Sequence, residues 1–362
     1  MILLDITSQT NEDDIHSNNY LTIKLTNKYD INTYNSFTNN PIIKNMIKLD
    51  DSLELKIKIC KFLGEGSYGQ VYKIQIENEY YALKINENEK PEKLYQRYES
   101  ITDVDKLKKY IINIWISGKI KCDKFSYFSI MEYGGKTLKS IINEIKLSHM
   151  VHILKQLFNI ALIVSKYKIL LTDFKLGNIT ISSDNRLKII DLYMDCESYS
   201  PCVKCRIVKT YSTIEIETEK RIYEDPEYNF TCIYIPLAIS LIDLLCKNTA
   251  SYYFSKLALE YNISLNIKGM IPLVQIACYN YSNDSNEPIK KYKNVYSIKK
   301  KLEEKYPFIK NPKFYDYFLN LPKPREEYKS FISTKRILLI INALFSIDPQ
   351  QRSLTFLKDK LI

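Results

Sequence analysis

Hydrophobic and polar residues alternate along the first third of the chain, as they do in β-strands that have one buried face. The alternation extends from about residue 53 to residue 85, where it is broken by a glycine-rich segment and by a polar turn at residues 77–79. It returns in residues 111–121 and 125–133. The pattern predicts a run of antiparallel strands followed by two further strands.

Beyond Gly134-Gly135, apolar residues recur instead at the spacing of helices. A charged stretch at residues 90–109 also has helical character. A β-rich first part followed by a helix-rich remainder predicts an α+β fold with two lobes, residues 53–133 and residues 134–362. The predicted helices of the second lobe cover residues 138–145, 150–165, 233–245 and 335–345.

Residues 1–45 differ from both lobes because they are polar and rich in asparagine. Their few apolar residues follow neither the strand period nor the helix period over any length. We therefore expect this segment to be an extension that is ordered in part at most.

The composition is that of a folded protein with a substantial core. The chain has 362 residues, of which 45% are hydrophobic and 26% charged, so wholesale disorder and a coiled coil are both excluded. The 52 Lys and Arg exceed the 42 Asp and Glu, for a net charge of +10. The sequence shows neither the long apolar run of a membrane-spanning helix nor the basic leader of a secreted protein. We therefore expect an intracellular protein, cytoplasmic or nuclear, with reduced cysteines.

Three of the eight glycines form the pattern Gly64-x-Gly66-x-x-Gly69. Positions without a side chain let backbone N–H groups approach phosphate oxygens closely. A Walker A loop is excluded because Gln70-Val71 follow the last glycine, and a dinucleotide fingerprint is disfavoured because the next residues alternate like a strand. A plain glycine-rich hairpin remains an alternative.

A second block of polar residues lies in the helical part of the chain. It reads Thr-Asp173-Phe-Lys175-Leu-Gly-Asn178, and Asp191 follows thirteen residues after Asn178. Short hydrophobic runs between Asn178 and Asp191 predict a pair of strands. Amide and carboxylate oxygens are the ligands that Mg²⁺ prefers, and a carboxylate such as Asp173 can accept a hydroxyl proton.

On these residues the chain resembles the eukaryotic protein kinase family, as a divergent serine/threonine kinase, over about residues 58–357. The resemblance implies a bilobal fold with a small antiparallel β lobe that carries one main helix, and a larger, mostly helical lobe. It also implies ATP and Mg²⁺ as cofactors, with Mn²⁺ as an alternative ion, and proteins as substrates. A membrane partner and nucleic acid are not expected.

The resemblance implies a nucleotide site on the first lobe. Lys84 would hold the α- and β-phosphates, and Glu99, with Glu92 as the alternative, would pair with Lys84. Met131 would stand in the gatekeeper place, at the start of a hinge whose backbone pairs with adenine. The implied nucleotide-contacting residues are Leu63, Gly64, Glu65, Gly66, Ser67, Tyr68, Gly69, Val71, Ala82, Lys84, Met131, Glu132 and Tyr133.

The resemblance also assigns the chemistry of the second block. Asp173 would accept the proton of the substrate hydroxyl, and Lys175 would neutralise charge on the γ-phosphoryl group. A lysine two residues after the aspartate is the serine/threonine pattern. Asn178 and Asp191 would bind Mg²⁺.

Other positions match the family less closely. Glu215 stands in the place of the glutamate that ends the activation segment, and the resemblance implies a salt bridge from it to Arg352, with Glu227 as the competing partner. Leu171-Thr172 replace the usual His-Arg, Tyr193 replaces a glycine, and Ile233 falls where an aspartate is usual. Because no residue that would touch ATP, metal or the proton is lost, we favour an active kinase over a pseudokinase scaffold that only binds nucleotide.

Three remaining groups have mostly ordinary interpretations. Cys196, Cys202 and Cys205, with Cys232, would suit a structural metal, but incidental thiols are favoured. His149 and His152 lack a third ligand nearby. The basic run at residues 290–301 would suit nucleic acid in a basic binding protein, but a solvated insert is favoured because acidic residues follow it.

Overall fold

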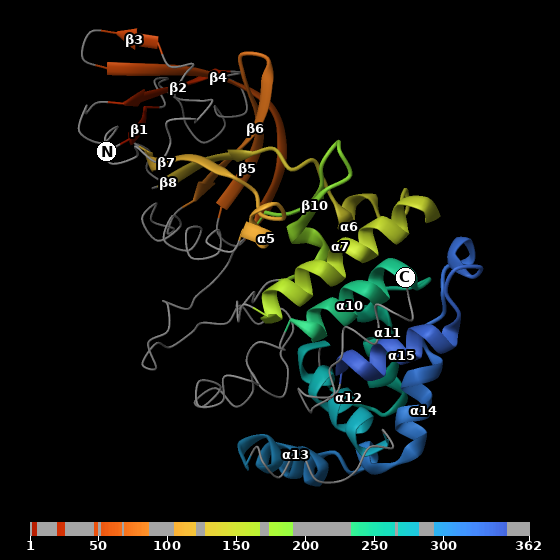
Figure 1. Cartoon of the computed structure of the whole chain (residues 1–362). Helices are drawn as coiled ribbons and strands as arrows, with labels where there is room; N and C mark the ends of the chain where they lie inside the picture. The colour runs from red at the N-terminus through yellow and green to blue at the C-terminus, as the bar shows by residue number, and fades with distance from the viewer. Residues whose placement is uncertain are drawn as a thin grey trace. The chain divides into compact units, whose positions relative to one another are not determined.

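The computed structural model describes the chain in segments, which Figure 1 draws in colour. It divides into two compact units, one of Met1–Gly135 with Ser182–Asp184, the other of Lys136–Ile181 with Asn185–Ile362. The predicted mixture of helices and antiparallel strands is confirmed at this coarse level. The described residues are 2–5, 20–25, 47–49, 52–66, 69–86, 105–120, 127–166, 174–190, 233–264, 267–281 and 293–345.

The first unit is built on one sheet of eight strands in the order β2-β1-β7-β8-β6-β5-β4-β3. Strand β2 also pairs with β4, so that seven of the strands close into a ring. Strand β1 runs parallel to β7, whereas the other described pairs are antiparallel. The strands are β1 Ile2–Asp5, β2 Tyr20–Leu25, β3 Ile47–Leu49, β4 Ser52–Gly66, β5 Gly69–Ile76, β6 Glu79–Asn86, β7 Ile114–Ile120 and β8 Tyr127–Glu132.

Alternation along the strands fills the interior of this ring. In the middle of β5, β6 and β8, every second side chain is apolar and turned to the same buried face, as the period-two pattern predicts. Removal of these side chains from water is the main force that holds the sheet together. The interior residues, each at most 2% exposed, are Ile57, Tyr72, Ile74, Ile76, Leu83, Ile85, Ile116, Phe128 and Ile130.

Strands β1 and β2 come from the segment that the sequence predicts to be a polar extension. Their sequences, ILLD and YLTIKL, alternate over too few residues to stand out from the asparagine-rich segment around them. Strand β4 is 15 residues long, and its first part offers β2 an edge to pair with, in the register Leu25↔Leu53 to Tyr20↔Lys58. Pairing with a distant strand therefore supplies the order that local sequence does not.

The second unit is mostly helical, and the described residues of the whole chain contain nine α-helices. The four helices predicted from periodicity are found, although the first is shorter than expected. Of the predicted helix at residues 90–109, the structure describes only residues 105–109, which contain the short helix α5, Asp105–Lys108. The other helices are α6 Leu138–Ile141, α7 Leu147–Lys166, α10 Tyr234–Leu245, α11 Ala250–Glu260, α12 Ile267–Tyr281, α13 Lys293–Lys305, α14 Pro312–Asn320 and α15 Thr334–Phe345.

Helix α10 forms the centre of the second unit. Of its twelve residues, all but Asp243 are buried, and the helix packs against α15. Phe254 of α11 stacks on Phe318 of α14, and both rings approach Phe345 of α15. These contacts join four helices around one apolar core.

Helix α7 is the one described helix that is long and apolar enough, by length and composition alone, to cross a membrane. Half of the window Leu147–Val164 is buried inside the structure, as expected for the core helix of a folded unit. Its two histidines, His149 and His152, are exposed, in agreement with an ordinary helix surface.

Most of the basic segment at residues 290–301 lies in α13. Most of its side chains are exposed, and Lys299 pairs with Glu303 one turn later. Because acidic and basic side chains both occur along the helix, part of its positive charge is balanced within the helix.

Candidate functional site

Lys84 lies in the middle of the first unit's sheet, with a strand on each side. Strand β6 pairs Lys84 with Val71 of β5 and with Ser129 of β8. The next row of the sheet joins Ala82 to Met131. Since residues in register share a face, Val71, Ala82, Lys84 and Met131 all lie on the face opposite the buried interior. The structure thus brings together four of the predicted nucleotide-contacting residues.

The glycine pattern occupies the hairpin between β4 and β5, where Gly64 pairs with Val71 and Gly66 with Gly69. A Cβ atom at Gly69 would lie 1.9 Å from the carbonyl oxygen of Ile85, so no other residue fits there. A Cβ atom at Gly66 would meet no heavy atom within 4 Å, so the described packing does not require this glycine. The close approach of the strands therefore requires Gly69, whereas Gly66 leaves open space beside its backbone.

A strand follows the glycine pattern, as the alternation predicts. Strand β5 begins at Gly69, whereas a dinucleotide fingerprint requires a helix at that point. Leu63 and Glu65 are exposed on the hairpin, and Ser67 and Tyr68 lie outside the described residues. The hairpin is compatible with a phosphate-covering loop and with the plain hairpin that the sequence leaves open.

The predicted hinge is bonded to a residue that the sequence does not single out. The N–H of Glu132 donates to the carbonyl oxygen of Asn113 at 2.8 Å. In return, the Glu132 carboxylate accepts from the Asn113 side chain at 2.9 Å and from its backbone N–H at 3.2 Å. These bonds occupy the Glu132 N–H and part of its carboxylate, so adenine could be read there only by other groups of the hinge.

Aromatic rings hold a second lysine on the same face as Lys84. The ammonium of Lys73 lies 3.6 Å from the ring centroid of Tyr80 and 4.8 Å from that of Tyr133. Lys73 pairs with Ala82 across the strands, one row from Lys84. The cation–π contacts keep the Lys73 charge beside Tyr133.

In the second unit, the residues after Asp173 form a short loop with two apolar anchors. Phe174 and Leu176 are buried, whereas Lys175, which lies between them, and Asn178 are half-buried. The loop ends in a 3-10 turn at Leu176–Asn178, where the Asn178 N–H donates to the Lys175 carbonyl at 2.9 Å. Burial of the apolar pair turns the polar residues toward the surface of this unit.

The strand pair predicted between Asn178 and Asp191 is confirmed. Strands β10, Ile179–Ile181, and β11, Leu187–Ile189, pair antiparallel with Ile179 opposite Ile189. Beyond the last pair, the Ile190 N–H donates to the Asn178 carbonyl at 3.0 Å. The hairpin therefore brings Asn178 next to the residue that directly precedes Asp191.

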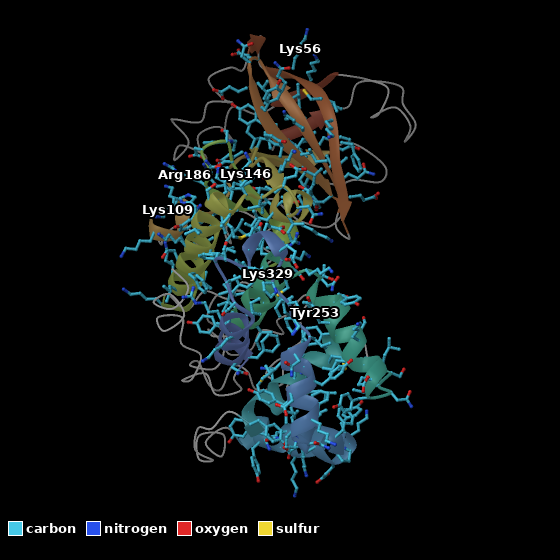
Figure 2. The ribbon with its side chains drawn as sticks, turned by 90° about the vertical axis from the view of Figure 1, so that its right-hand side faces the viewer. Lys56, Lys109, Lys146, Arg186, Tyr253 and Lys329 are labelled. Atoms are coloured by element: carbon cyan, nitrogen blue, oxygen red, sulfur yellow. The ribbon has the colours of Figure 1, made fainter. Side chains whose placement is uncertain are left out.

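Two contacts support the hairpin from outside. Strand β9, Lys136–Thr137, pairs with the outer side of β10. On the other side, the side-chain amide of Gln156 on α7 donates to the Asn185 carbonyl at 2.8 Å and accepts from the Leu187 N–H at 2.9 Å. Arg186, labelled in Figure 2, lies between these two residues. A glutamine within an apolar helix is the only sequence signal that this contact leaves.

Several predicted residues lie outside the described part of the chain, and their predictions stand untested. They include the proposed base, one metal ligand and the partner of Lys84. The residues are Asp173, Asp191, Glu99, Glu92, Ser67, Tyr68, Tyr193, Glu215, Glu227, Arg352, Cys196, Cys202, Cys205 and Cys232.

The described thiols and acidic groups offer no separate site. Burial raises the pKa of Cys246 and of Cys278 to about 12, so both stay protonated and unreactive at neutral pH. Within the described ranges, no three His, Cys, Asp or Glu side chains come together as a metal site would require.

Lys84 belongs to the first unit and Asn178 to the second, and each lies in surroundings with its own binding chemistry. A lysine beside an open glycine hairpin can bind phosphate oxygens, and an amide with a following carboxylate can bind a hard cation. No protein-family model matches the chain, and no curated protein matches it either. The kinase resemblance therefore rests on the motifs, their order and their spacing.

Proposed function

We propose that this protein is a protein kinase that transfers the γ-phosphoryl group of Mg-ATP to serine or threonine hydroxyls of proteins. The observation that carries the proposal is the bond from the Ile190 N–H to the Asn178 carbonyl. It joins Asn178, the last residue of the polar block, to Ile190, which directly precedes Asp191, and so supports the order of groups that a phosphoryl-transfer site requires.

The geometry of the first unit supports the same function. Lys84 shares a sheet face with Val71 and Ala82, and the strand pairing fixes all three relative to the glycine hairpin. Gly66 has open space where a side chain would be, so a phosphate could approach its backbone. Lys84 would hold the α- and β-phosphates there.

The residues of the second unit fit a magnesium ion. Asn178 would supply an amide oxygen and Asp191 a carboxylate oxygen, and the hairpin brings Ile190, which directly precedes Asp191, next to Asn178. Bound Mg²⁺ would neutralise charge on the phosphates and hold them in line with the acceptor.

The chain's own residues would perform the transfer. The hydroxyl oxygen of the substrate forms a bond to the γ-phosphorus while the bond to the bridging oxygen breaks, and ADP leaves with that electron pair. Asp173 takes the hydroxyl proton, and Lys175 balances the charge of the migrating group. Phe174 and Leu176, both buried, anchor the loop that carries these side chains.

The test is transfer of labelled γ-phosphate from Mg-ATP to generic basic and acidic proteins, followed by phosphoamino-acid analysis. We expect label on serine or threonine, and a loss of about 10²–10⁴-fold in Asp173→Asn because the proton acceptor is removed. Asp316→Asn is the matched control, because Asp316 is exposed on α14.

Two results would contradict the proposal. Equal activity of Asp173→Asn and wild type would remove Asp173 from the chemistry. Absence of label under both Mg²⁺ and Mn²⁺, with ATP still raising the melting temperature, would favour the nucleotide-binding scaffold instead.

A further inference from the structure

Gln156 is a polar side chain in the middle of a buried helix face. It lies on α7 and is 7% exposed, and its helix neighbours Ile153, Leu157 and Ile160 are at most 1% exposed. A buried amide is unfavourable unless both its oxygen and its nitrogen find partners. Gln156 therefore needs a specific contact to occupy this position.

Both groups of the amide find partners on one hairpin. The Leu187 N–H donates to the side-chain oxygen of Gln156, and the side-chain nitrogen of Gln156 donates to the Asn185 carbonyl. These two partners fix which way round the Gln156 amide is oriented. Two bonds to positions two residues apart fix the tilt of the hairpin as well as its distance from α7. One bond alone would leave the hairpin able to rotate.

The contact meets a specific need of strand β11. In the sheet order β11-β10-β9, strand β11 is at an edge, so one row of its backbone groups has no strand partner. The side chain of Leu187 is fully buried, and its N–H is one of these edge groups. Gln156 satisfies this donor where water is excluded.

The same contact determines where the far end of the hairpin lies. Leu187 is three residues before Ile190, whose N–H bonds to Asn178. A slip of β11 by one residue would turn its side chains to the opposite face and separate Ile190 from Asn178. The two short strands have only three pairs to prevent such a slip.

We propose that Gln156 is a positioning residue for Asn178, the proposed metal ligand, acting by fixing the register of the β10–β11 hairpin. This inference rests on the proposed function, because Asn178 is assigned to Mg²⁺ there. Gln156 itself touches neither metal nor substrate.

The test compares the full-length variants Gln156→Leu and Gln275→Leu. Gln275 is a fully buried glutamine on α12, so the same substitution there controls for general loss of stability. The probe is Mn²⁺, titrated by electron paramagnetic resonance in the presence of a non-hydrolysable ATP analogue. We expect Gln156→Leu to weaken Mn²⁺ binding about 10- to 100-fold and Gln275→Leu to leave it within about twofold.

Hydrogen exchange gives a second readout that needs no activity. The Leu187 N–H should exchange at least about tenfold faster in Gln156→Leu than in wild type, because its buried acceptor is gone. Unchanged Mn²⁺ affinity despite faster exchange would overturn the inference. So would an equal loss of affinity in the two leucine variants.

If Gln156→Leu does not fold, Gln156→Glu decides the question. Its ionised carboxylate keeps an acceptor for Leu187 but loses the donor to Asn185, and protonation restores that donor. Its Mn²⁺ affinity relative to wild type should rise as pH falls from about 8 to about 6, since burial favours the protonated carboxyl. A ratio that does not change with pH would overturn the inference.

The outcomes also separate this inference from the proposed function. Weakened Mn²⁺ binding in Gln156→Leu, in a protein whose wild type transfers no phosphate, would support the positioning role and contradict the kinase. An active wild type together with normal Mn²⁺ binding in Gln156→Leu would support the kinase and contradict the positioning role. A wild type that binds no Mn²⁺ with the nucleotide would overturn the inference itself.

Discussion

Lys84 in the first unit and Asn178 in the second are held in different ways. Lys84 lies on a strand that pairs along its whole length with β5 and over residues 81–86 with β8, within a ring of seven strands. Asn178 lies at the end of a hairpin with three residue pairs, which a two-residue strand and the Gln156 amide support. Backbone pairing on both sides holds the strand that carries Lys84, whereas a side-chain contact from α7 supports the hairpin that carries Asn178.

This difference indicates where each of them is vulnerable. Around Lys84 the many ladder bonds share any disturbance, so a change of the lysine removes its charge without moving the strand. In the hairpin a single side chain supplies two of the stabilising contacts, so its loss moves backbone. A substitution of Lys84 should therefore act on chemistry, and a substitution of Gln156 should act on geometry.

The largest effect is expected from Lys84→Met. Removal of the charge should lower phosphate transfer by about 10²-fold or more, because the lysine would stabilise phosphate charge. The free energy of unfolding should hardly change, because methionine keeps the aliphatic stem in the sheet. Lys58→Met, an exposed lysine on β4 of the same sheet, is the control.

Activity assays and urea unfolding on the same preparations check this prediction. A Lys84→Met protein that transfers phosphate as fast as Lys58→Met would remove Lys84 from the site. A large loss of stability would show instead that the ladder does not hold the strand independently of the side chain.

The next effect concerns the close approach of strands at Gly69. In Gly69→Ala the new Cβ would overlap the carbonyl oxygen of Ile85, so β5 and β6 must separate. We expect a loss of about 3 kcal/mol in the free energy of unfolding. Gly66→Ala should change it by less than about 0.5 kcal/mol, because the Cβ enters open space.

Denaturant unfolding of both variants measures this contrast. Nucleotide affinity adds a second result, since Gly66→Ala should be stable but bind ATP more weakly if phosphates approach that backbone. Equal stability of Gly69→Ala and wild type would mean that the two strands are less tightly paired than described.

The Lys84 face was within reach of sequence reasoning because its signal is local. A period of two over three adjacent strands, with a turn between the second and third, predicts both the pairing and the shared face. The hairpin after Asn178 was predictable for the same reason, as two short apolar runs between polar ends. Spacing along the chain was enough in both cases.

The contacts that support these elements leave no such signal. Gln156 bonds to backbone 29 and 31 residues away, and Asn113 to Glu132 across 19 residues, without any period in the sequence. Strands β1 and β2 are ordered by pairing with distant strands. Helix α12 contains Pro272, which weakens its helical pattern. Long-range partners therefore decide what local pattern cannot.

A smaller effect is expected at the turn of the β10–β11 hairpin. Asn185 has φ of 60°, a left-handed conformation that asparagine and glycine tolerate and alanine disfavours. Asn185→Ala should lower the free energy of unfolding by about 1 kcal/mol, whereas Asn185→Gly should leave it nearly unchanged. Thermal or urea unfolding distinguishes the two.

This pair of variants sharpens the comparison between the two units. If the hairpin depends on few contacts, Asn185→Ala should also speed hydrogen exchange at Leu187 and Ile190, and leave Lys84 and its neighbours unaffected. Faster exchange throughout both units would contradict that independence.

The smallest expected effect is a change in the pH dependence of stability at Asp243, a titratable residue of the second unit. Asp243 on α10 accepts the Ala250 N–H at 2.7 Å. Burial raises the pKa of Asp243, although that hydrogen bond and the charges of Lys139 and Arg325 act to lower it. Because the folded state then holds its proton to higher pH than the unfolded state does, stability falls as pH rises from the ordinary aspartate pKa to the raised one.

Asp243→Asn should flatten this slope, because the amide keeps an acceptor for the Ala250 N–H and does not titrate. The measurement is the free energy of unfolding across that pH interval. Gln156→Leu should keep the wild-type slope while lowering the whole curve, since its amide is neutral at every pH. The opposite result would be a loss of the pH dependence of stability in Gln156→Leu and its persistence in Asp243→Asn. It would mean that the contact of Gln156 with the hairpin, and not the Asp243 carboxyl, makes the stability of this unit depend on pH.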